Sequence, residues 1–380
     1  MIQIKNKFDC CGCSACAQKC PRHCITMQED TEGFLYPSID LSQCIDCGLC
    51  EKVCPILHNP PSKLPIEVFA STNKNEYIRK DSSSGGLFSL IATYIISLGG
   101  VVFGARFNNE WEVIHDYTTT ERELALFRGS KYSQSKIGET FIKVESFLKD
   151  NIIVLFTGTP CQISGLKSFL RKDYDHLICV DITCHSVPSP KIWKRYLNEK
   201  IKKHHIKKRE ILSINFRDKY YSWTNYSFVI KKNKKKIVET KDENKYLVGF
   251  IHGLFSRPSC TNCCTKPDRN QSDITLGDFW GISQLHPEIN DDKGVSIIIV
   301  RTKKGQTIID KLHLDKTLLR YEDIVKYNPA INSNSPFSKY RNYFFNEEGS
   351  LEKKIDSFYP TPFKSIIKRF ILQRLNCHHK

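Results

Sequence analysis

The chain has 380 residues, enough for two or three domains, and a formal net charge of +16. It begins with no apolar run of the signal-peptide type, and its longest apolar stretch, residues 87–98, is too short to span a bilayer. Since disulfides rarely persist in reducing compartments, its 17 cysteines indicate a cytoplasmic, metal-binding protein rather than a secreted disulfide scaffold or a transmembrane protein.

Two copies of one cysteine pattern, C-x2-C-x2-C-x3-C-P, stand 34 positions apart near the N-terminus. This spacing is typical of paired [4Fe–4S] clusters, in which the fourth cysteine of each run ligates the other cluster. Disulfides and zinc sites seldom repeat such a spacing with its proline. The sequence therefore predicts one cluster on Cys10, Cys13, Cys16 and Cys54, and a second on Cys44, Cys47, Cys50 and Cys20.

The cysteine runs define a small ferredoxin-like domain that we expect to cover residues 1–58, with a short strand pair within residues 33–40. Residues 59–66 are rich in proline and are predicted to form a stiff linker. Beyond it, strand-like runs alternate with helical patterns through residues 67–334, which predicts a larger mixed α/β domain. The fold class is thus α+β and α/β combined: a dicluster domain, an α/β domain and a basic helical tail over residues 335–380.

The expected elements of the α/β domain follow from apolar runs and helical periodicity. Strands are predicted over residues 68–72, 101–107, 152–156, 177–182 and 294–301, helices over residues 86–98, 136–148 and 161–170, and a lysine-tipped hairpin over residues 228–239.

Four cysteines outside the first domain indicate a third cluster. Cys161 and Cys184 each follow a buried strand, and the ends of strands are where α/β folds gather their chemistry. Cys260 and Cys263 form a C-x2-C pair in a turn-rich segment, so the three segments can supply four thiolates. Zinc in the same cysteines and independent buried thiols are the alternatives, and the sequence does not decide between Cys263 and Cys264. Neighbours of predicted ligands are expected to be spare thiols: Cys11, Cys24 and Cys264.

Lysine is concentrated in residues 200–209, 231–236 and 364–380. Solvated helix and hairpin faces, or docking of an acidic electron carrier, explain such runs, and each bound cluster would add roughly −2 to the charge. Peripheral membrane contact through the basic tail is a further alternative. No recognised nucleic-acid module accompanies the lysines, so we expect no nucleic-acid partner.

Five short segments, in this order, resemble the family of beta subunits of coenzyme F-420 hydrogenases and dehydrogenases over nearly the whole chain. They are residues 82–86 (SSSGG), 129–132 (GSKY), 158–162 (GTPCQ), 181–185 (DITCH) and 272–281 (SDITLGDFWG). The resemblance implies an FAD in the α/β domain beside a cluster held by Cys161, Cys184, Cys260 and Cys263. Residues 181–193 look most similar to members found among bacterial surface-polysaccharide genes beside pyruvyl transferases.

The chemistry of these segments suits a flavin. Ser84, Gly85 and Gly86 are predicted to open a helix whose free amides and positive dipole end can hold a pyrophosphate, although serine and glycine also punctuate ordinary helices. The predicted cofactor-binding residues are Ser82, Ser84, Gly85, Gly86, Gly129, Ser130, Lys131, Tyr132, Gln134, Thr157, Gly158, Thr159, Asp278 and Trp280.

Three residues are predicted to be catalytic. Lys131 can place a cation near the reduced flavin, unless it is a surface lysine. Asp278 suits a site wall because aspartate is seldom buried unpaired. His185 follows a predicted cluster ligand and can relay a proton to a reduced substrate, or donate a hydrogen bond to a cluster sulfur.

The sequence therefore predicts an oxidoreductase with three [4Fe–4S] clusters and FAD. One-electron carriers would feed the N-terminal clusters, and the flavin would exchange hydride with a deazaflavin or another organic substrate. The expected partner is an acidic ferredoxin or flavodoxin-like carrier, or a reductase or hydrogenase subunit. The alternative is an electron-transfer subunit that docks a catalytic partner and has no small-molecule site of its own.

Overall fold

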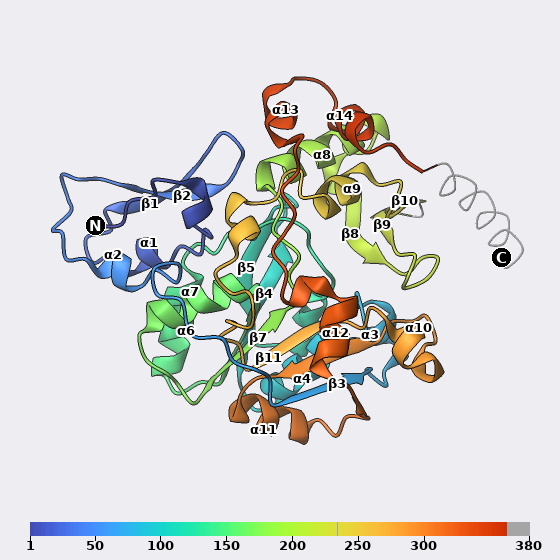
Figure 1. Ribbon diagram of the computed structural model, residues 1–380, viewed down its shortest axis with the longest axis horizontal. Coiled ribbons are helices and arrows are strands. Elements are labelled where there is room, and N and C mark those ends of the chain that lie inside the picture. The colour runs from blue at the N-terminus through green and yellow to red at the C-terminus, as the bar shows by residue number, and fades with distance from the viewer. Residues whose placement is uncertain (234, 363–380) are drawn as a thin grey trace, which may run out of the picture.

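The computed structural model describes residues 1–233 and 235–362. Three bodies make up the fold: an N-terminal cluster domain (residues 1–58), a large mixed sheet with helices on both faces, and a small sheet covered by helices (Figure 1). The predicted fold class is confirmed. The predicted tail is helical in its described part, with α13 (Arg341–Asn346) and α14 (Leu351–Phe358), and its basic residues 364–380 lie outside the described residues.

In the cluster domain, each cysteine run leads into a short helix, α1 (Ala15–Lys19) or α2 (Leu49–Lys52). Strands β1 (Ile25–Glu29) and β2 (Leu35–Ile39) form an antiparallel pair between the runs. The predicted strand pair within residues 33–40 is wrong, because only β2 lies there. The turn falls earlier, since the Asp30 carboxylate accepts the amides of Glu32 and Phe34 at 3.1 and 2.9 Å and Gly33 takes a positive φ of 90°.

The large sheet has the strand order β13-β3-β12-β11-β7-β6-β4-β5. Its centre is parallel, from β4 through β6 and β7 to β11, and its flanks are antiparallel. Since parallel strands end at one edge, this topology gathers the residues that follow β6, β7 and β11. The strands are β3 (Glu67–Ser71), β4 (Val101–Phe107), β5 (Val113–Thr118), β6 (Val154–Gly158), β7 (Leu177–Ile182), β11 (Ile274–Asp278), β12 (Ser296–Val300) and β13 (Thr317–Leu318).

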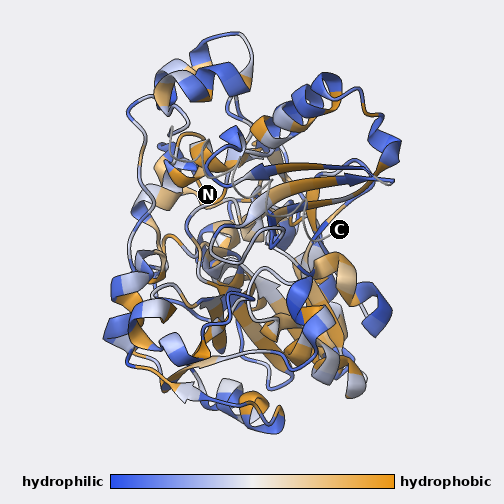
Figure 2. Cartoon of the chain, turned by 90° about the vertical axis from the view of Figure 1, so that its right-hand side faces the viewer, coloured by the Kyte–Doolittle hydropathy of each residue, from blue (hydrophilic) through white to orange (hydrophobic). Residues whose placement is uncertain are grey.

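Helices cover both faces of this sheet. On one face α4 (Leu87–Ser97) and α11 (Lys303–Lys311) pack on β-branched and aromatic side chains of the strands. On the other, α6 (Thr140–Lys149) and α7 (Pro160–Leu170) share a core with Cys11, Cys13 and Ala15 of the cluster domain. The two domains are therefore joined by a common hydrophobic core, and Figure 2 shows hydrophobic residues along the strands and hydrophilic ones on the outer helix faces.

The predicted helix over residues 136–148 begins later than expected, at Thr140. Lys136 instead donates its amide to Val113 at the edge of β5, and Gly138 has a positive φ of 54°. Helical periodicity does not reveal this bridge, because the bridge depends on a strand more than twenty positions away.

The small sheet contains β8 (Ile211–Asp218), β9 (Ser227–Lys232) and β10 (Lys235–Thr240), so the predicted lysine-tipped hairpin forms. Helices α8 (Pro190–Lys203), α9 (Lys245–Ile251), α13 and α14 cover it. Its core is aromatic, with Trp193, Tyr196 and Phe216 at the centre. Its strands, α8 and α9 lie within the predicted 67–334 unit, whereas α13 and α14 belong to the predicted tail. The remaining α-helices are α3 (Glu76–Lys80), α5 (Leu124–Phe127), α10 (Ile282–Leu285) and α12 (Tyr321–Tyr327).

The basic run over residues 200–209 is partly structural. The Lys200 ammonium is buried between the carboxylates of Glu239 and Glu352, which tie α8 to β10 and α14. Lys203 pairs with Glu352 at 2.6 Å.

Among the described residues no helix combines the length and apolarity needed to cross a bilayer.

Candidate functional site

One cavity of the cluster domain is lined by all four cysteines predicted to hold the first cluster: Cys10, Cys13, Cys16 and Cys54. Cys54 comes from the second cysteine run, so the structure brings together the crossed set. Burial raises the pKa of Cys16 to about 12. A thiolate in this cavity therefore needs a cationic partner, which iron provides.

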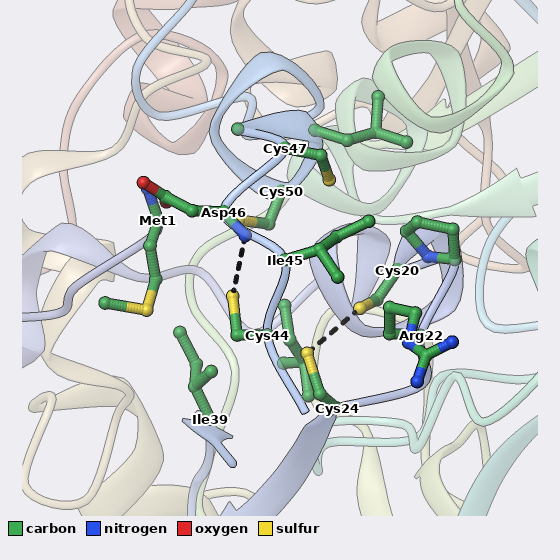
Figure 3. Close-up of a pocket in the computed structure, with 14 residues that line it drawn as sticks. Met1, Cys20, Arg22, Cys24, Ile39, Cys44, Ile45, Asp46, Cys47 and Cys50 are labelled. Carbon is green, nitrogen blue, oxygen red and sulfur yellow. Dashed lines mark hydrogen bonds and ion pairs between the residues drawn. The ribbon is translucent and has the colours of Figure 1, made fainter. Parts of the chain in front are cut away.

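A second cavity is lined by the other crossed set, Cys20, Cys44, Cys47 and Cys50 (Figure 3). It lies nearer the solvent, because Cys47 is exposed and Asp46 donates its backbone amide to the Cys44 sulfur at 3.4 Å on the rim. Cys24, predicted as a spare thiol, also lines this cavity, with its sulfur 3.4 Å from that of Cys20.

The donor chemistry of both cavities fits a cubane cluster. In the described chain no three His, Cys, Asp or Glu side chains converge closely enough to hold a single metal ion. In a cubane each thiolate binds a different iron, so the four sulfurs surround a volume rather than a point. Four cysteines around each cavity, with apolar neighbours such as Ile2 and Val53, fit that arrangement.

The third cysteine set lies where β6 and β7 end. Cys161 is in the first turn of α7, directly after β6, and Cys184 follows β7. Cys260 lies in the short 3-10 helix η4 (Pro258–Asn262), and Cys263 is its C-cap. Cys184 is within electrostatic reach of the other three thiols, and burial raises its pKa well above the ordinary value. The structure therefore brings together the four cysteines predicted to hold a third cluster.

The neighbouring residues Cys263 and Cys264 face different partners. Cys263 interacts with Cys161, Cys184 and Cys260, and its sulfur lies 3.1 Å from the Thr265 hydroxyl. The Cys264 thiol is also within electrostatic reach of Cys161, but it lies against Cys11, which together with burial raises the pKa of Cys264 far above its usual range. This geometry favours Cys263 as the fourth ligand.

Cys11 joins the first cavity to the third cysteine set. It lines the first cavity, and its thiol also lies against Cys161 and Cys264. The approach is close because α7 carries Gly165, where an added Cβ would stand 2.5 Å from the Cβ of Cys13. The first cavity is therefore adjacent to the third set.

The serine–glycine segment 82–86 opens α4 as predicted, with Gly86 as the N-cap. Its polar groups are used within the protein: the Gly85 amide donates to the Ser296 hydroxyl at 3.0 Å, and the Ser84 hydroxyl donates to the Val295 carbonyl at 2.8 Å. A Cβ at Gly85 would stand 2.7 Å from the Ser296 nitrogen, so close packing on β12 requires this glycine. The Ser82 hydroxyl donates to the Ile78 carbonyl at 2.6 Å.

The segment 129–132 lies beside segment 82–86. The Ser130 amide and hydroxyl both donate to the Ser83 hydroxyl, at 2.8 and 3.1 Å. Gly129 has a φ of 79° and nothing within 4 Å of an added Cβ, so one side of this turn is open. Tyr132 follows and stacks on Phe250 with ring centroids 4.5 Å apart.

Arg217, at the end of β8, connects these turns to Asp278 and Trp280. Its Nη1 donates to the Asp278 carboxylate, and its guanidinium lies 5.2 Å from the Trp280 ring. The Tyr132 side chain lies beside it. Sequence reasoning missed Arg217, although a charged residue within the buried stretch of a strand was a signal that could have found it.

The other predicted cofactor residues use their polar groups internally. The Lys131 ammonium donates to three carbonyls at the end of α5, those of Phe127, Arg128 and Gly129, and burial lowers its pKa to about 7. The Gln134 amide donates to the Cys11 carbonyl at 3.0 Å, on the cluster side. Thr157, Gly158 and Thr159 end β6, where Thr157 donates to Phe103 and Thr159 caps α7.

His185 lies between the third cysteine set and the stacked rings of Phe250 and Tyr132, which we call the aromatic wall. It follows Cys184, its ring meets Phe250 edge-on at 5.2 Å, and Phe250 in turn stacks on Tyr132. Its Nε2 is 3.1 Å from the Ile251 carbonyl, and burial lowers its pKa. The predicted catalytic histidine is thus next to both predicted cofactor sites.

The comparisons with known proteins agree with this arrangement. Residues 153–326 match the family described as the C terminus of the beta subunit of coenzyme F420 hydrogenase/dehydrogenase, and residues 9–56 match a 4Fe-4S dicluster domain. Residues 153–326 belong to that family of beta subunits. The predicted resemblance to this family is confirmed, and the two matches relate the chain to iron–sulfur subunits of oxidoreductases.

Relatives of this chain include the F(420)H(2) dehydrogenase of Methanosarcina mazei, whose F subunit is 22% identical over 79% of this chain and 81% of the relative. Ferredoxin 7Fe of Hydrogenibacillus schlegelii is 35% identical over 18% of this chain and 74% of its own length. A chain of the F420-reducing [NiFe] hydrogenase complex from Methanosarcina barkeri has 15% identity and a TM-score of 0.47, covering 71% of this chain and 92% of its own.

The α/β domain also buries a histidine that makes its stability depend on pH. His115 is 6% exposed, its ring nitrogens lie 2.8 Å from the Ser135 hydroxyl and 2.9 Å from the Thr157 carbonyl, and burial lowers its pKa to about 4. The folded chain therefore binds fewer protons here than the unfolded chain, and stability should fall as the pH drops below about 6.5. Between pH 7 and 5 we expect a loss of about 2 kcal/mol.

Urea unfolding of the wild type and of His115→Gln at several pH values checks this expectation. The difference between the two free energies of unfolding should shrink as the pH falls. Parallel curves from pH 7 to pH 5 would show that His115 is not the titrating group.

Proposed function

We propose that this protein is an iron–sulfur flavoprotein that exchanges electrons between a one-electron carrier and an organic two-electron substrate. The three cysteine sets would hold [4Fe–4S] clusters, and FAD would bind among the turns around Ser130, Tyr132 and Arg217. A bound flavin supplies the conversion between one-electron and two-electron chemistry. The substrate class is a deazaflavin or another organic acceptor, including a sugar-linked one in surface-polysaccharide synthesis.

The continuity of the cysteines carries this proposal. From the exposed Cys47 the sets lead through the first cavity and Cys11 to Cys161, and Cys184 then adjoins His185 and the aromatic wall. No whole domain lies between one of the three cysteine sets and the next. A protein that used its clusters only for structural support would not need this order.

The exposed side of the second cavity would receive the one-electron partner. Ile45, which lines it, is 62% exposed, and Leu41, four positions earlier in the chain, is 66% exposed, which suits docking of a ferredoxin-type carrier or of a reductase or hydrogenase subunit. A subunit partner is supported by the M. mazei relative, whose name describes a dehydrogenase subunit. A cytoplasmic location belongs to the same proposal, since exposed thiols such as Cys47 need a reducing environment.

Anaerobic purification followed by iron, sulfide and flavin analysis tests the cofactor content. We expect about twelve irons and one FAD per chain, because each predicted cubane contains four irons. Eight irons would contradict the third cluster, and a chain with twelve irons that neither retains nor binds FAD would contradict the flavin site.

An electron-transfer subunit without its own substrate site is the second candidate, and the subunit name of the M. mazei relative favours it. The two functions differ in what the isolated protein can do. If the FAD-loaded chain oxidises a reduced deazaflavin without any added protein, using a redox dye as acceptor, the second candidate is excluded. Activity that appears only with an added partner protein would support it.

A further inference from the structure

Arg217 leaves one edge of its guanidinium without a partner. Its side chain is 4% exposed, and although the Tyr132 side chain lies beside the guanidinium, neither Nε nor Nη2 has a hydrogen-bond acceptor in good geometry among the described residues. Buried donors without acceptors are costly and uncommon in folded proteins, so such a pair calls for an explanation. Nε and Nη2 lie on the same edge of the guanidinium, where they form the two-pronged fork that matches two oxygens of a carboxylate or phosphate.

The rest of the guanidinium is held rigidly. Nη1 donates to the Asp278 carboxylate, which also accepts the Trp223 indole N–H at 3.3 Å. The guanidinium plane lies over Tyr226 at 4.5 Å, and Trp280, which it also contacts, stacks on Trp223 with an interplanar angle of 2°. The fork is therefore preorganised before any ligand binds.

The surroundings of the fork are suited to an anion. Lys219, the first residue after β8, adds a second positive charge. Its ammonium donates hydrogen bonds to the carbonyls of Arg79, Ser84 and Lys293 at 2.6–2.7 Å. It therefore fixes segment 82–86 beside the fork without competing for the ligand. Asp278, the nearest carboxylate, already neutralises part of the Arg217 charge from the opposite edge.

We propose that Arg217 binds an oxyanion, a phosphate or carboxylate group of a cofactor or substrate, side-on through Nε and Nη2. This inference rests on the proposed function, because the diphosphate of FAD and an acidic group of the two-electron substrate are the two sources of such an oxyanion. The chemistry is the same in both cases, and only binding measurements separate them.

The test compares wild type, Arg217→Lys and a control, Arg106→Lys, in the full chain with its clusters. Lysine keeps the charge but lacks the fork. Arg106 makes its own ion pair with Asp116 on β4 and β5, away from the fork. Fluorescence titration with FAD and with riboflavin, which lacks phosphate, and calorimetric titration of the FAD-loaded protein with inorganic phosphate give the affinities.

If the oxyanion belongs to FAD, Arg217→Lys weakens FAD binding about 10- to 100-fold and leaves riboflavin binding unchanged. If it belongs to the substrate, FAD affinity is unchanged, but phosphate binds the FAD-loaded wild type and not the variant. Equal affinities in all arms overturn the inference, whereas failure of the wild type to bind any flavin contradicts the proposed function. Should Arg217→Lys not fold, the charge-neutral double variant Arg217→Gln/Asp278→Asn replaces it, with the same expectations.

Discussion

Alanine at Cys263 should remove about four irons from the roughly twelve expected, whereas alanine at the adjacent Cys264 should leave the iron content unchanged. The reason is geometric: Cys263 shares its surroundings with Cys161, Cys184 and Cys260, and Cys264 is turned toward Cys11. Iron and sulfide analysis of the anaerobic proteins, together with the electron paramagnetic resonance spectrum of the reduced clusters, measures the outcome.

One further variant extends this comparison. Cys184→Ala should match Cys263→Ala, losing about four irons without disturbing the N-terminal pair. Loss of iron from Cys264→Ala but not from Cys263→Ala would reverse the assignment. Loss from neither would mean that the third set does not hold a cluster.

The grouping of the N-terminal cysteines around two cavities could be predicted from sequence because their spacing is a local property. A C-x2-C-x2-C-x3-C-P run specifies a loop that ligates one cluster. The fourth cysteine of each run lines the cavity formed by the other run, as Cys54 and Cys20 do here. The strand ends that carry Cys161 and Cys184 could also be located, since each follows a short continuous apolar run.

The arginines that organise the sites could not be predicted in the same way. Arg217 meets Asp278 across 61 positions, and Arg257 meets Cys10 across 247. Hydrophobic periodicity assigns a residue to the inside of an element but not to a partner in another element. For the same reason the small aromatic sheet could not be separated from the larger one before its core was seen.

The internal hydrogen bonds of segment 82–86 illustrate a related point. Ser84-Gly85-Gly86 does open a helix, yet its groups hold β12 in place, and the unpaired donors of this region are the buried Nε and Nη2 of Arg217. A motif can therefore mark the correct neighbourhood while other residues supply the contacts with a ligand.

Arg257→Ala should lower the free energy of unfolding by about 3–5 kcal/mol, because it removes one buried side chain and leaves three acceptors unpaired, one buried and two partly buried. Arg257 is 1% exposed and donates to the carbonyls of Cys10 and Leu35, at 2.7 and 2.9 Å, and to the Gln134 side chain at 3.0 Å. Its guanidinium also lies over the Tyr36 ring at 4.4 Å. One arginine of the beta-subunit domain thus holds the backbone of the first cysteine run and the hairpin behind it.

Loss of the Arg257 hydrogen bonds should separate the cluster domain from the α/β domain before either unfolds, because Arg257 donates to both sides of their interface. We expect the first thermal transition to fall by roughly 5–10 °C and proteolytic cleavage within residues 59–66 to accelerate. Arg320→Ala, at an exposed arginine, is the matched control and should change neither. If the Arg257 variant keeps the wild-type cleavage rate and midpoint, the shared core of Cys11, Cys13 and Ala15 with α6 and α7 is sufficient to hold the domains together. If both change, the arrangement that keeps Cys11 beside Cys161 is maintained by an arginine that is not among the predicted cluster ligands.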